Sequence, residues 1–336
     1  MVNDLYTPDK THVLKAIKMA AWRNADAKLE AADVQKMDRY IDGNLDPPIS
    51  VVTPSGKGSF LPNYLESGYM PGVWTEMLYF QTAMQLYPSM GICTTADDTP
   101  SASLYTHTFG IRTAQTPTNQ GRHWERENTT DAESERIDIL GMLCRTHHIE
   151  CSETQPVGVQ LLNWGCAFTL NAATDDITAA QADDIPFKWT HFTFPTFTYN
   201  SETIEAYITG WSFDVQNTVM FFNPDSTGYH QVGRYVPQTT LSTTLEIIPY
   251  GKNAFELVRT KLGGYLTDLD LTVKCARSAT DYVQWVHDKC YCFPFTLRAV
   301  KDPGTVERYF LRMVQLDTGS LVPTAVDDYD DDYYET

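Results

Sequence analysis

The sequence predicts a mainly β protein, a β-sandwich or barrel with an N-terminal helical extension and one or two short flanking helices. Three observations lead to this prediction. From Tyr105 to Arg298, aromatic and β-branched residues alternate with polar ones, which is the period of a strand with one buried face. Clusters of Gly, Pro, Asn and Asp separate these runs, as they do between the strands of a sheet. The only long tract with helical spacing lies before residue 50.

Residues 1–50 are predicted to form the N-terminal helical extension. Thr7 and Pro8 supply an N-cap followed by a proline suited to the first helical position. Apolar residues then recur at helical spacing, at Val13, Ile17, Ala20 and Ala21. The polar stretch 24–26 interrupts the tract, and a second helix is expected over residues 31–41, before Gly43. We expect this extension to cover one face of the sheet.

Residues 51–320 are predicted to form a β-rich domain. A loop at 43–73 that is rich in Pro and Gly spans the start of this domain. A short buried helix is expected after the loop, over Thr75–Tyr87. A further short helix is expected at Phe255–Leu262. The expected strands are Leu104–Phe109, Ile137–Ile149, Val157–Leu170, His191–Thr198, Thr203–Gln216, Leu241–Ile248, Leu271–Ala276, Tyr291–Val300 and Tyr309–Leu316.

Three polar segments are predicted to lie outside the sheet. Residues 110–135 and 171–186 are long connections, which in a compact domain are usually functional or become ordered by a partner, so we expect them to be assembly loops. Residues 321–336 are expected to be an acidic, flexible tail, because the last ten residues contain six acids and no base.

The densest group of metal-binding residue types is Cys144, His147, His148 and Cys151. Zinc requires four nitrogen or sulfur ligands in tetrahedral geometry. In a regular strand, residues 147 and 151 share one face, whereas 144 and 148 share the other. One strand therefore cannot aim all four at one ion, and we expect ordinary strand residues with no metal or cofactor.

Motifs for catalysis are not found in the sequence. No Gly-x-Ser-x-Gly occurs, and Ser55–Ser59 lacks the order of a phosphate-binding loop. Chance carboxylate pairs are expected among 43 acids. The protein is therefore predicted not to be an enzyme, with no catalytic or cofactor-binding residues. Four tryptophans are expected to be core or interface residues rather than stacking platforms, namely Trp164, Trp189, Trp211 and Trp285.

Charge and cysteine content narrow the class of protein further. The net charge of −18 disfavours nonspecific nucleic-acid binding, which needs Lys and Arg to neutralise phosphates. The first fifty residues carry seven basic and eight acidic residues, so they are not a basic genome-packaging arm. Seven cysteines, an odd number, indicate reduced thiols in a cytosol-like compartment. No apolar run approaches the roughly 18 residues that span a bilayer, and no signal peptide is visible, so membrane insertion is not expected.

In their order, several segments resemble the tail tube (major tail) proteins of long-tailed, siphovirus-like viruses of bacteria or archaea. Tyr105–Phe109 looks like the family's Tyr-x-His-Thr-Phe strand, and a short helix is expected before it. Residues 141–149 and 158–162 are similar to its next strand pair. Residues 208–217 resemble a long strand that an asparagine closes, and 233–245 the strand that follows a polar loop. The resemblance covers about residues 75–300.

This resemblance implies a structural virion protein of the virus tail that is assembled in the host cytoplasm. In the family, the larger sheet of a β-sandwich joins those of its neighbours, and six copies close into a ring. The rings stack into a tube through which DNA passes without specific binding. The implied partners are further copies of the chain and other tail proteins.

Two other classes of protein fit the same composition. A jelly-roll viral capsid protein is also β-rich and aromatic, although the near-neutral N-terminus counts against genome-packaging versions of it. A carbohydrate-binding β-sandwich of a virus spike would instead present exposed aromatic side chains along a groove.

Overall fold

The computed structural model describes most of the sheet-forming part of the chain. The described residues are 13–18, 38–46, 49–52, 66–69, 72–97, 104–113, 120–126, 135–153, 155–166, 170–171, 184–194, 198–199, 202–203, 205–222, 232–250, 266–292, 308–314 and 321–329.

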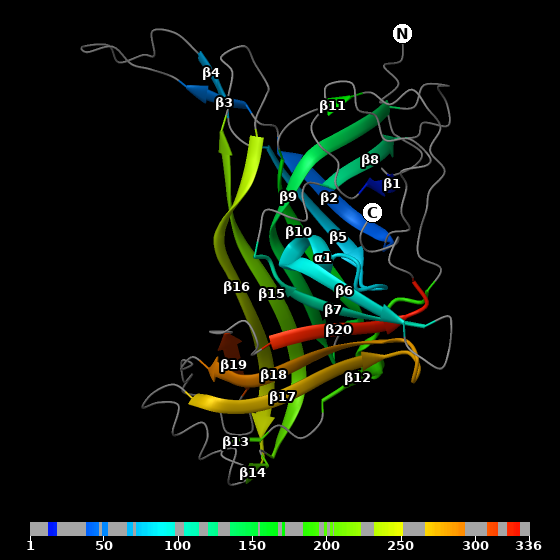
Figure 1. The fold of residues 1–336 in the computed structure, drawn as a ribbon, viewed down its shortest axis with the longest axis vertical. Helices are drawn as coiled ribbons and strands as arrows, with labels where there is room; N and C mark the ends of the chain where they lie inside the picture. The colour runs from blue at the N-terminus through cyan, green and yellow to red at the C-terminus, as the bar shows by residue number, and fades with distance from the viewer. Residues whose placement is uncertain are drawn as a thin grey trace, which may run out of the picture.

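The protein is mainly β, and its strands form two layers (Figure 1). The first layer, called the large sheet, has the order β2 (Tyr40–Asp46), β5 (Gly72–Tyr79), β10 (Gln155–Cys166), β9 (Glu135–Ser152), β15 (Ala206–Phe222), β16 (Val232–Pro249) and β19 (Tyr309–Val314). The second layer, called the small sheet, has the order β17 (Leu266–Ala276), β18 (Tyr282–Cys292), β20 (Leu321–Asp327), β7 (Tyr105–Ile111) and β6 (Gly91–Asp97). Every one of these pairings is antiparallel. The small sheet runs across the large one, and β18 joins them by pairing with the end of β19.

Shorter elements extend the two sheets. On β9 lie β8 (Gln120–Arg126) and β11 (Leu170–Asn171), and β1 (Val13–Lys18) pairs with β8. On β17 lie β12 (Phe192–Thr193) and β13 (Thr198–Tyr199), which also pairs with β14 (Glu202–Thr203). A separate two-stranded sheet consists of β3 (Ile49–Val52) and β4 (Glu66–Tyr69). The helical elements are α1 (Leu86–Met90) and the 3₁₀ turn η2 (Trp189–His191).

The core lies between the two sheets and is aromatic at its centre. Trp211 of β15 meets Trp285 of β18 with ring centroids 4.5 Å apart, and Phe213 lies 6.0 Å from the same ring. Phe80 and Phe187 extend the cluster, with centroids 5.1 Å apart. Each fully buried side chain of this size contributes about 1.5–3 kcal/mol of hydrophobic free energy. The prediction that Trp211 and Trp285 belong to the core is confirmed, whereas the side chain of Trp164 lies outside the described part.

Most of the expected strands are confirmed by the structure. Alternating burial marks them, as in β5, where every second residue faces the core. The segments confirmed in their described residues are Leu104–Phe109, Ile137–Ile149, Val157–Leu170, Thr203–Gln216, Leu241–Ile248, Leu271–Ala276 and Tyr309–Leu316. Two of these strands are longer than expected, because β16 begins at Val232 and β15 continues to Phe222. Residues 167–169, 204 and 315–316 lie outside the described part. The segment His191–Thr198 contains only the short β12 and the start of β13 after η2. Of the strand expected at Tyr291–Val300, residues 291 and 292 belong to β18, which begins at Tyr282, and residues 293–300 lie outside the described part.

The helical predictions need correction. Residues 13–18 form strand β1, because pairing with β8 satisfies their backbone and outweighs a weak local helix propensity. The second expected helix overlaps β2, which begins at Tyr40. The other residues of the predicted extension up to residue 37 lie outside the described part, as does the helix expected at Phe255–Leu262.

The short helix expected at Thr75–Tyr87 was misplaced. Residues 75–79 belong to β5, and α1 begins at Leu86. The apolar residues at 77 and 78 suggested a helix, but they lie on opposite faces of a strand whose two faces are both substantially covered. Residues 80–86 are all buried, so no amphipathic pattern was available to mark the true helix.

The segment 110–135 is not a uniform loop. It contains strand β8, which pairs with β9 as an added strand of the sheet. Of the other expected assembly loop, 171–186, residues 172–183 lie outside the described part. Its last residues are fixed next to the core, where the Gln81 amide donates a hydrogen bond to the Asp184 carbonyl and Phe187 is buried.

The prediction of a flexible tail from residue 321 is wrong for its first part. Residues 321–327 form β20, which lies between β18 and β7 in the small sheet. The Asp327 carboxylate is buried and accepts a hydrogen bond from His107 Nε2 at 3.1 Å. Tyr329 accepts a second bond from that nitrogen through its carbonyl, and its hydroxyl donates to Asp184 at 2.7 Å. The count of acidic residues could not distinguish Asp327, whose carboxylate accepts a buried hydrogen bond, from its exposed neighbour Asp328.

This arrangement predicts different effects for two truncations at the C-terminus. A chain that ends at Val326 loses both acceptors of buried His107, so its free energy of unfolding should fall by about 1–3 kcal/mol. A chain that ends at Tyr329 keeps both acceptors and should unfold as the full chain does. Denaturant unfolding measures the two values, and equal stabilities for the two truncated chains would contradict the role given to Asp327 and Tyr329.

Candidate functional site

The four metal-type residues of β9 are not brought together around one point. His147 and Cys151 are both buried on the core face, as predicted, but Cys144 is buried on that face too. A register shift against β10 leaves Arg145 as an extra residue, which turns Cys144 to the core side. His148 lies on the opposite face. Within the described ranges, no group of three or more His, Cys, Asp or Glu residues is placed to hold a metal ion.

Buried His147 contacts Ser89, and this contact stabilises the fold rather than preparing a catalytic base. Its Nδ1 lies 2.9 Å from Ser89 Oγ, and the Ser89 hydroxyl donates to the Leu86 carbonyl at 2.9 Å. The imidazole must then donate from Nδ1, and its buried Nε2 has no hydrogen-bond partner in the described part of the chain. Burial, with the neighbouring His148, lowers the pKa of His147 to about 3, so the ring stays neutral. It lacks the orienting acid that a catalytic base needs.

The main polar cluster lies at the C-terminal end of α1, where helix carbonyls lack helical partners. Arg112, just after β7, donates from Nη2 to the carbonyls of Pro88 (2.7 Å) and Ser89 (3.1 Å), and its backbone N–H donates to Met90. Its guanidinium carbon lies 3.4 Å from the centroid of the Tyr235 ring, a cation–π contact. Burial raises the pKa of Tyr235 to about 12, so the phenol stays neutral and accepts from the Cys144 N–H at 3.0 Å.

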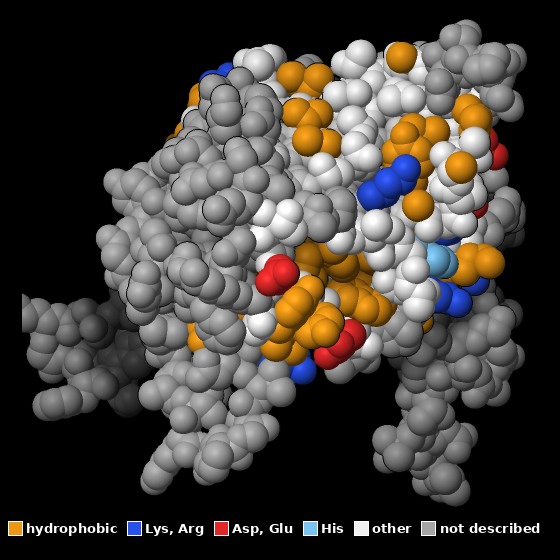
Figure 2. All heavy atoms as spheres, turned by 90° about the horizontal axis from the view of Figure 1, so that it is seen from below, with side chains coloured by type: hydrophobic (Ala, Val, Ile, Leu, Met, Phe, Trp, Pro, Cys, Tyr) orange, Lys and Arg blue, Asp and Glu red, His pale blue; other side chains and the backbone are white. Residues whose placement is uncertain are grey.

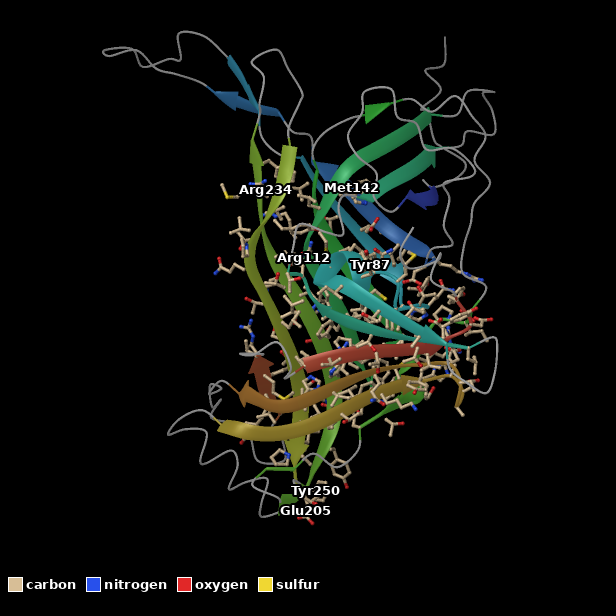
Figure 3. The ribbon with its side chains drawn as sticks, in the orientation of Figure 1. Tyr87, Arg112, Met142, Glu205, Arg234 and Tyr250 are labelled. Carbon is tan, nitrogen blue, oxygen red and sulfur yellow. The ribbon has the colours of Figure 1, made fainter. Side chains whose placement is uncertain are left out.

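The long hairpin enters the same cluster through Asn217. Its amide nitrogen donates to the carbonyls of Ser89 (2.8 Å) and Cys144 (3.1 Å), and its amide oxygen accepts from the Thr239 hydroxyl at 2.7 Å. We call Arg112, Tyr235 and Asn217, with the carbonyls of Pro88, Ser89 and Met90 that end α1, the helix latch. It joins α1, the end of β7, and strands β9, β15 and β16 at one point (Figure 3).

Glycine is required beside the helix latch. Gly91 ends α1 with φ +111°, a left-handed conformation that other residues rarely adopt. A Cβ at this position would lie 2.2 Å from Arg112 Cβ. The sequence therefore turns sharply out of α1 into β6 and leaves room for Arg112.

On the outer face of the large sheet, His148 lies between two carboxylates. Its Nδ1 is 2.6 Å from Asp214 on β15, and its Nε2 is 3.5 Å from Glu150. The hydrogen bond with Asp214 raises the pKa of His148 above its usual value, against the opposing effect of burial. This triad is solvent-accessible, but its histidine contacts carboxylates on both nitrogens, so neither is left to activate a nucleophile.

Beyond the helix latch, β15 and β16 continue as a two-stranded ribbon. β15 pairs with β9 only over residues 210–216, and β16 pairs with β19 only over residues 242–247. We call residues 217–222 and 232–241 the distal ribbon, and among the strands that the structure describes they form backbone ladders only within the β15–β16 hairpin. The ribbon runs along one side of the molecule, at the left in Figure 1, and diverges there from β9.

The other end of the hairpin carries exposed aromatic side chains. Tyr207 and Tyr250 pack with ring centroids 4.5 Å apart, and Phe310 on β19 is exposed nearby on the same sheet face. We call Tyr207, Ile248, Tyr250 and Phe310 the basal patch. Beside it, Arg308 bridges Glu246 at 2.9 Å and Glu153 at 3.5 Å. The view from below shows hydrophobic side chains beside acidic ones on the described surface (Figure 2).

Comparison with models of known protein families gave no match, and comparison with curated proteins gave none either. In the part of the chain that the structure describes, no helix is both long and apolar enough to cross a membrane. The fold and its surfaces are therefore the observations from which a function can be proposed.

Sequence reasoning did not identify the helix latch or the basal patch. The latch joins residues that are separated by up to about 150 positions in the sequence, and no short sequence pattern predicts such a contact. One signal was present, because Asn217 was singled out as an asparagine that closes a long strand. The basal patch comes from ends of β15, β16 and β19, whose proximity depends on the strand order.

The helix latch predicts a selective loss of stability for Arg112→Met. The variant removes two charged hydrogen bonds to helix carbonyls, so its free energy of unfolding should fall by roughly 1.5–3 kcal/mol. The matched control is Arg145→Met, because Arg145 is exposed on β9 and its change should stay within about 0.5 kcal/mol. Denaturant unfolding at neutral pH compares the two, and a loss as small as the control's would refute the latch.

Proposed function

We propose that the protein is a tail tube subunit of a long-tailed virus, a structural virion protein rather than an enzyme. Copies of the chain join their large sheets side by side into a ring, and the rings stack around a channel for DNA. The observation that carries this proposal is the distal ribbon, whose outer edges have no strand partner among the described residues.

Unpaired strand edges of this length favour addition of a further strand. Six residues of β15 and ten of β16 present their outer backbone groups beyond the last pairing with β9 and β19. Natural sheets usually cover, shorten or charge such edges, since they otherwise promote association. In a closed ring, each ribbon would be flanked by the ribbons of two neighbours, which removes both edges at once.

Four of the five strand segments that resemble tail tube proteins lie on neighbouring strands of the large sheet, and the fifth, Tyr105–Phe109, lies in β7 of the small sheet. Residues 141–149 and 158–162 lie in the paired strands β9 and β10, and 208–217 and 233–245 lie in the paired strands β15 and β16. Because β9 also pairs with β15, the four segments form one continuous part of the large sheet. Asn217, which matches the asparagine that closes the family's long strand, belongs to the helix latch, although β15 continues beyond it to Phe222.

The charge of the chain suits a channel that DNA must leave. A net charge of −18 repels phosphates, so a ring of these subunits would not hold the passing duplex by nonspecific attraction. On the outer face of the large sheet, acids such as Glu150 and Asp214 accompany His148.

A jelly-roll capsid protein is the alternative class, and the strand order combines local hairpins with pairings of non-consecutive strands, namely β5–β10, β9–β15, β16–β19, β18–β20 and β20–β7. Hairpins of consecutive strands supply four major pairings here, namely β6–β7, β9–β10, β15–β16 and β17–β18. A jelly roll is built from two Greek keys, in which a strand returns by a long connection to lie beside a non-consecutive one.

Electron microscopy of the purified protein in negative stain tests the proposal. We expect rings, or stacked tubes, with a central stain-filled channel, and sedimentation should give masses that are multiples of the 38.0 kDa chain. Closed spherical shells would favour the capsid class instead. A monomer that binds glycans and never forms rings would exclude both virion classes.

A further inference from the structure

We propose that the two ends of the β15–β16 hairpin are complementary docking surfaces that stack one copy of the chain on the next. The basal patch and Glu205 of one copy receive Met220 and Arg234 of another. This inference rests on the proposed function, because it names the contact by which successive rings would associate.

The basal end offers an apolar surface beside a negative charge. Tyr207 is 62% exposed, Tyr250 56% and Phe310 57%, which is high for large apolar side chains that lie close together. Glu205 is exposed at the same place, and its carbonyl accepts a hydrogen bond from the Tyr250 N–H at 3.1 Å. This bond fixes the acidic residue beside the aromatic pair.

The distal end offers an apolar side chain beside a positive charge. Met220 is 58% exposed and lies directly opposite exposed Arg234 in the hairpin register. The adjacent residue Gly233 packs closely on Leu143 and Phe221, at 2.5 Å from where its Cβ would be, so that side of the ribbon is covered. Met220 and Arg234 therefore face away from the body of the protein.

The two surfaces lie near opposite ends of the hairpin, which runs along the direction of the molecule's long axis (Figure 3). Arg234 is near one end of the hairpin, and Glu205 and Tyr250 are at the other (Figure 3). Strands of 17 and 18 residues at roughly 3.3 Å per residue place these ends on the order of 50 Å apart. One copy cannot therefore bring its own two surfaces together, and the partner must be a second copy.

The chemistry of the two ends is matched. A methionine thioether packs well against aromatic rings, and Arg234 can form a charge-assisted hydrogen bond with a carboxylate. Because the two surfaces differ, the contact is head-to-tail and leaves a free surface at each end of the assembly. Such head-to-tail contacts continue as an open stack wherever the rotation between copies does not close them into a ring, and an open stack is the geometry that a tube requires.

A charge-exchange experiment tests the pairing of Arg234 with Glu205. In Arg234→Glu and in Glu205→Arg, each docking contact opposes like charges, so the association constant for stacking should fall about tenfold or more. An equimolar mixture of the two variants should restore stacking when layers of the two variants alternate. At one contact, Glu at position 234 of the first variant then faces Arg at position 205 of the second, and at the next contact the native Arg234 faces the native Glu205. Tube lengths in electron micrographs and sedimentation at about 0.1 M salt measure this.

Two controls keep the result specific. Arg145→Glu makes the same charge change on an exposed residue of β9 and should stack as the unaltered protein does. Tyr207→Ser combined with Tyr250→Ser removes the aromatic pair and should leave rings that do not stack. All variants should unfold within a few degrees of the unaltered protein, because every changed side chain is exposed.

The outcomes separate this inference from the proposed function. If the unaltered protein forms rings that stack and the two charge reversals stack equally well, the docking surfaces are wrong while the tube function stands. If each reversal blocks stacking but the mixture does not restore it, the two residues do not face one another and the inference also fails. If no rings form at all, the proposed function fails with it.

Discussion

The rest of the fold depends on how the carbonyl groups at the end of α1 are satisfied. A five-residue helix buried against a sheet presents several acceptors that water cannot reach. Arg112, Tyr235 and Asn217 supply donors from three different strands or their ends, and Ser89 holds His147 of a fourth. One helix end thereby fixes the relative positions of β7, β9, β15 and β16, which belong to both sheets.

The helix latch explains how the far part of the β15–β16 hairpin can diverge from the rest of the large sheet and still be held in place. Below the helix latch, β15 is paired on both sides and its core face meets the tryptophan cluster. Above it, the ribbon keeps its own ladder, Gly233 packs on Leu143 and Phe221, and Asn217 and Tyr235 anchor the start of the ribbon to the latch. The protein thus combines a root held by several buried hydrogen bonds with edges that a neighbouring copy can complete, which supports the proposed role in building an assembly.

The sequence alone predicted the sheet well and the helices poorly, for physical reasons. Alternating burial along a strand gives apolar residues a spacing of two in the sequence, as in β15, where Trp211, Phe213 and Val215 face the core. Helix α1 leaves no such trace, because the residues around it are buried on every side. The latch could not be predicted, since Asn217 and Ser89 meet only after the chain has crossed the sheet several times. Asp327 was predicted to be part of a solvated tail, because the sequence gives the residue type but does not show whether the carboxylate is buried.

Hydrogen exchange of the distal ribbon tests the central claim most directly. If neighbouring copies complete the sheet, the backbone amides of residues 217–222 and 232–241 should exchange much more slowly in assembled tubes than in free subunits. Amides of the buried strand pair β17–β18 serve as the reference, and their exchange should be the same in both forms. Equal exchange of the ribbon amides in tubes and in free subunits would contradict the account, because the unpaired edges would then have no partner in the assembly.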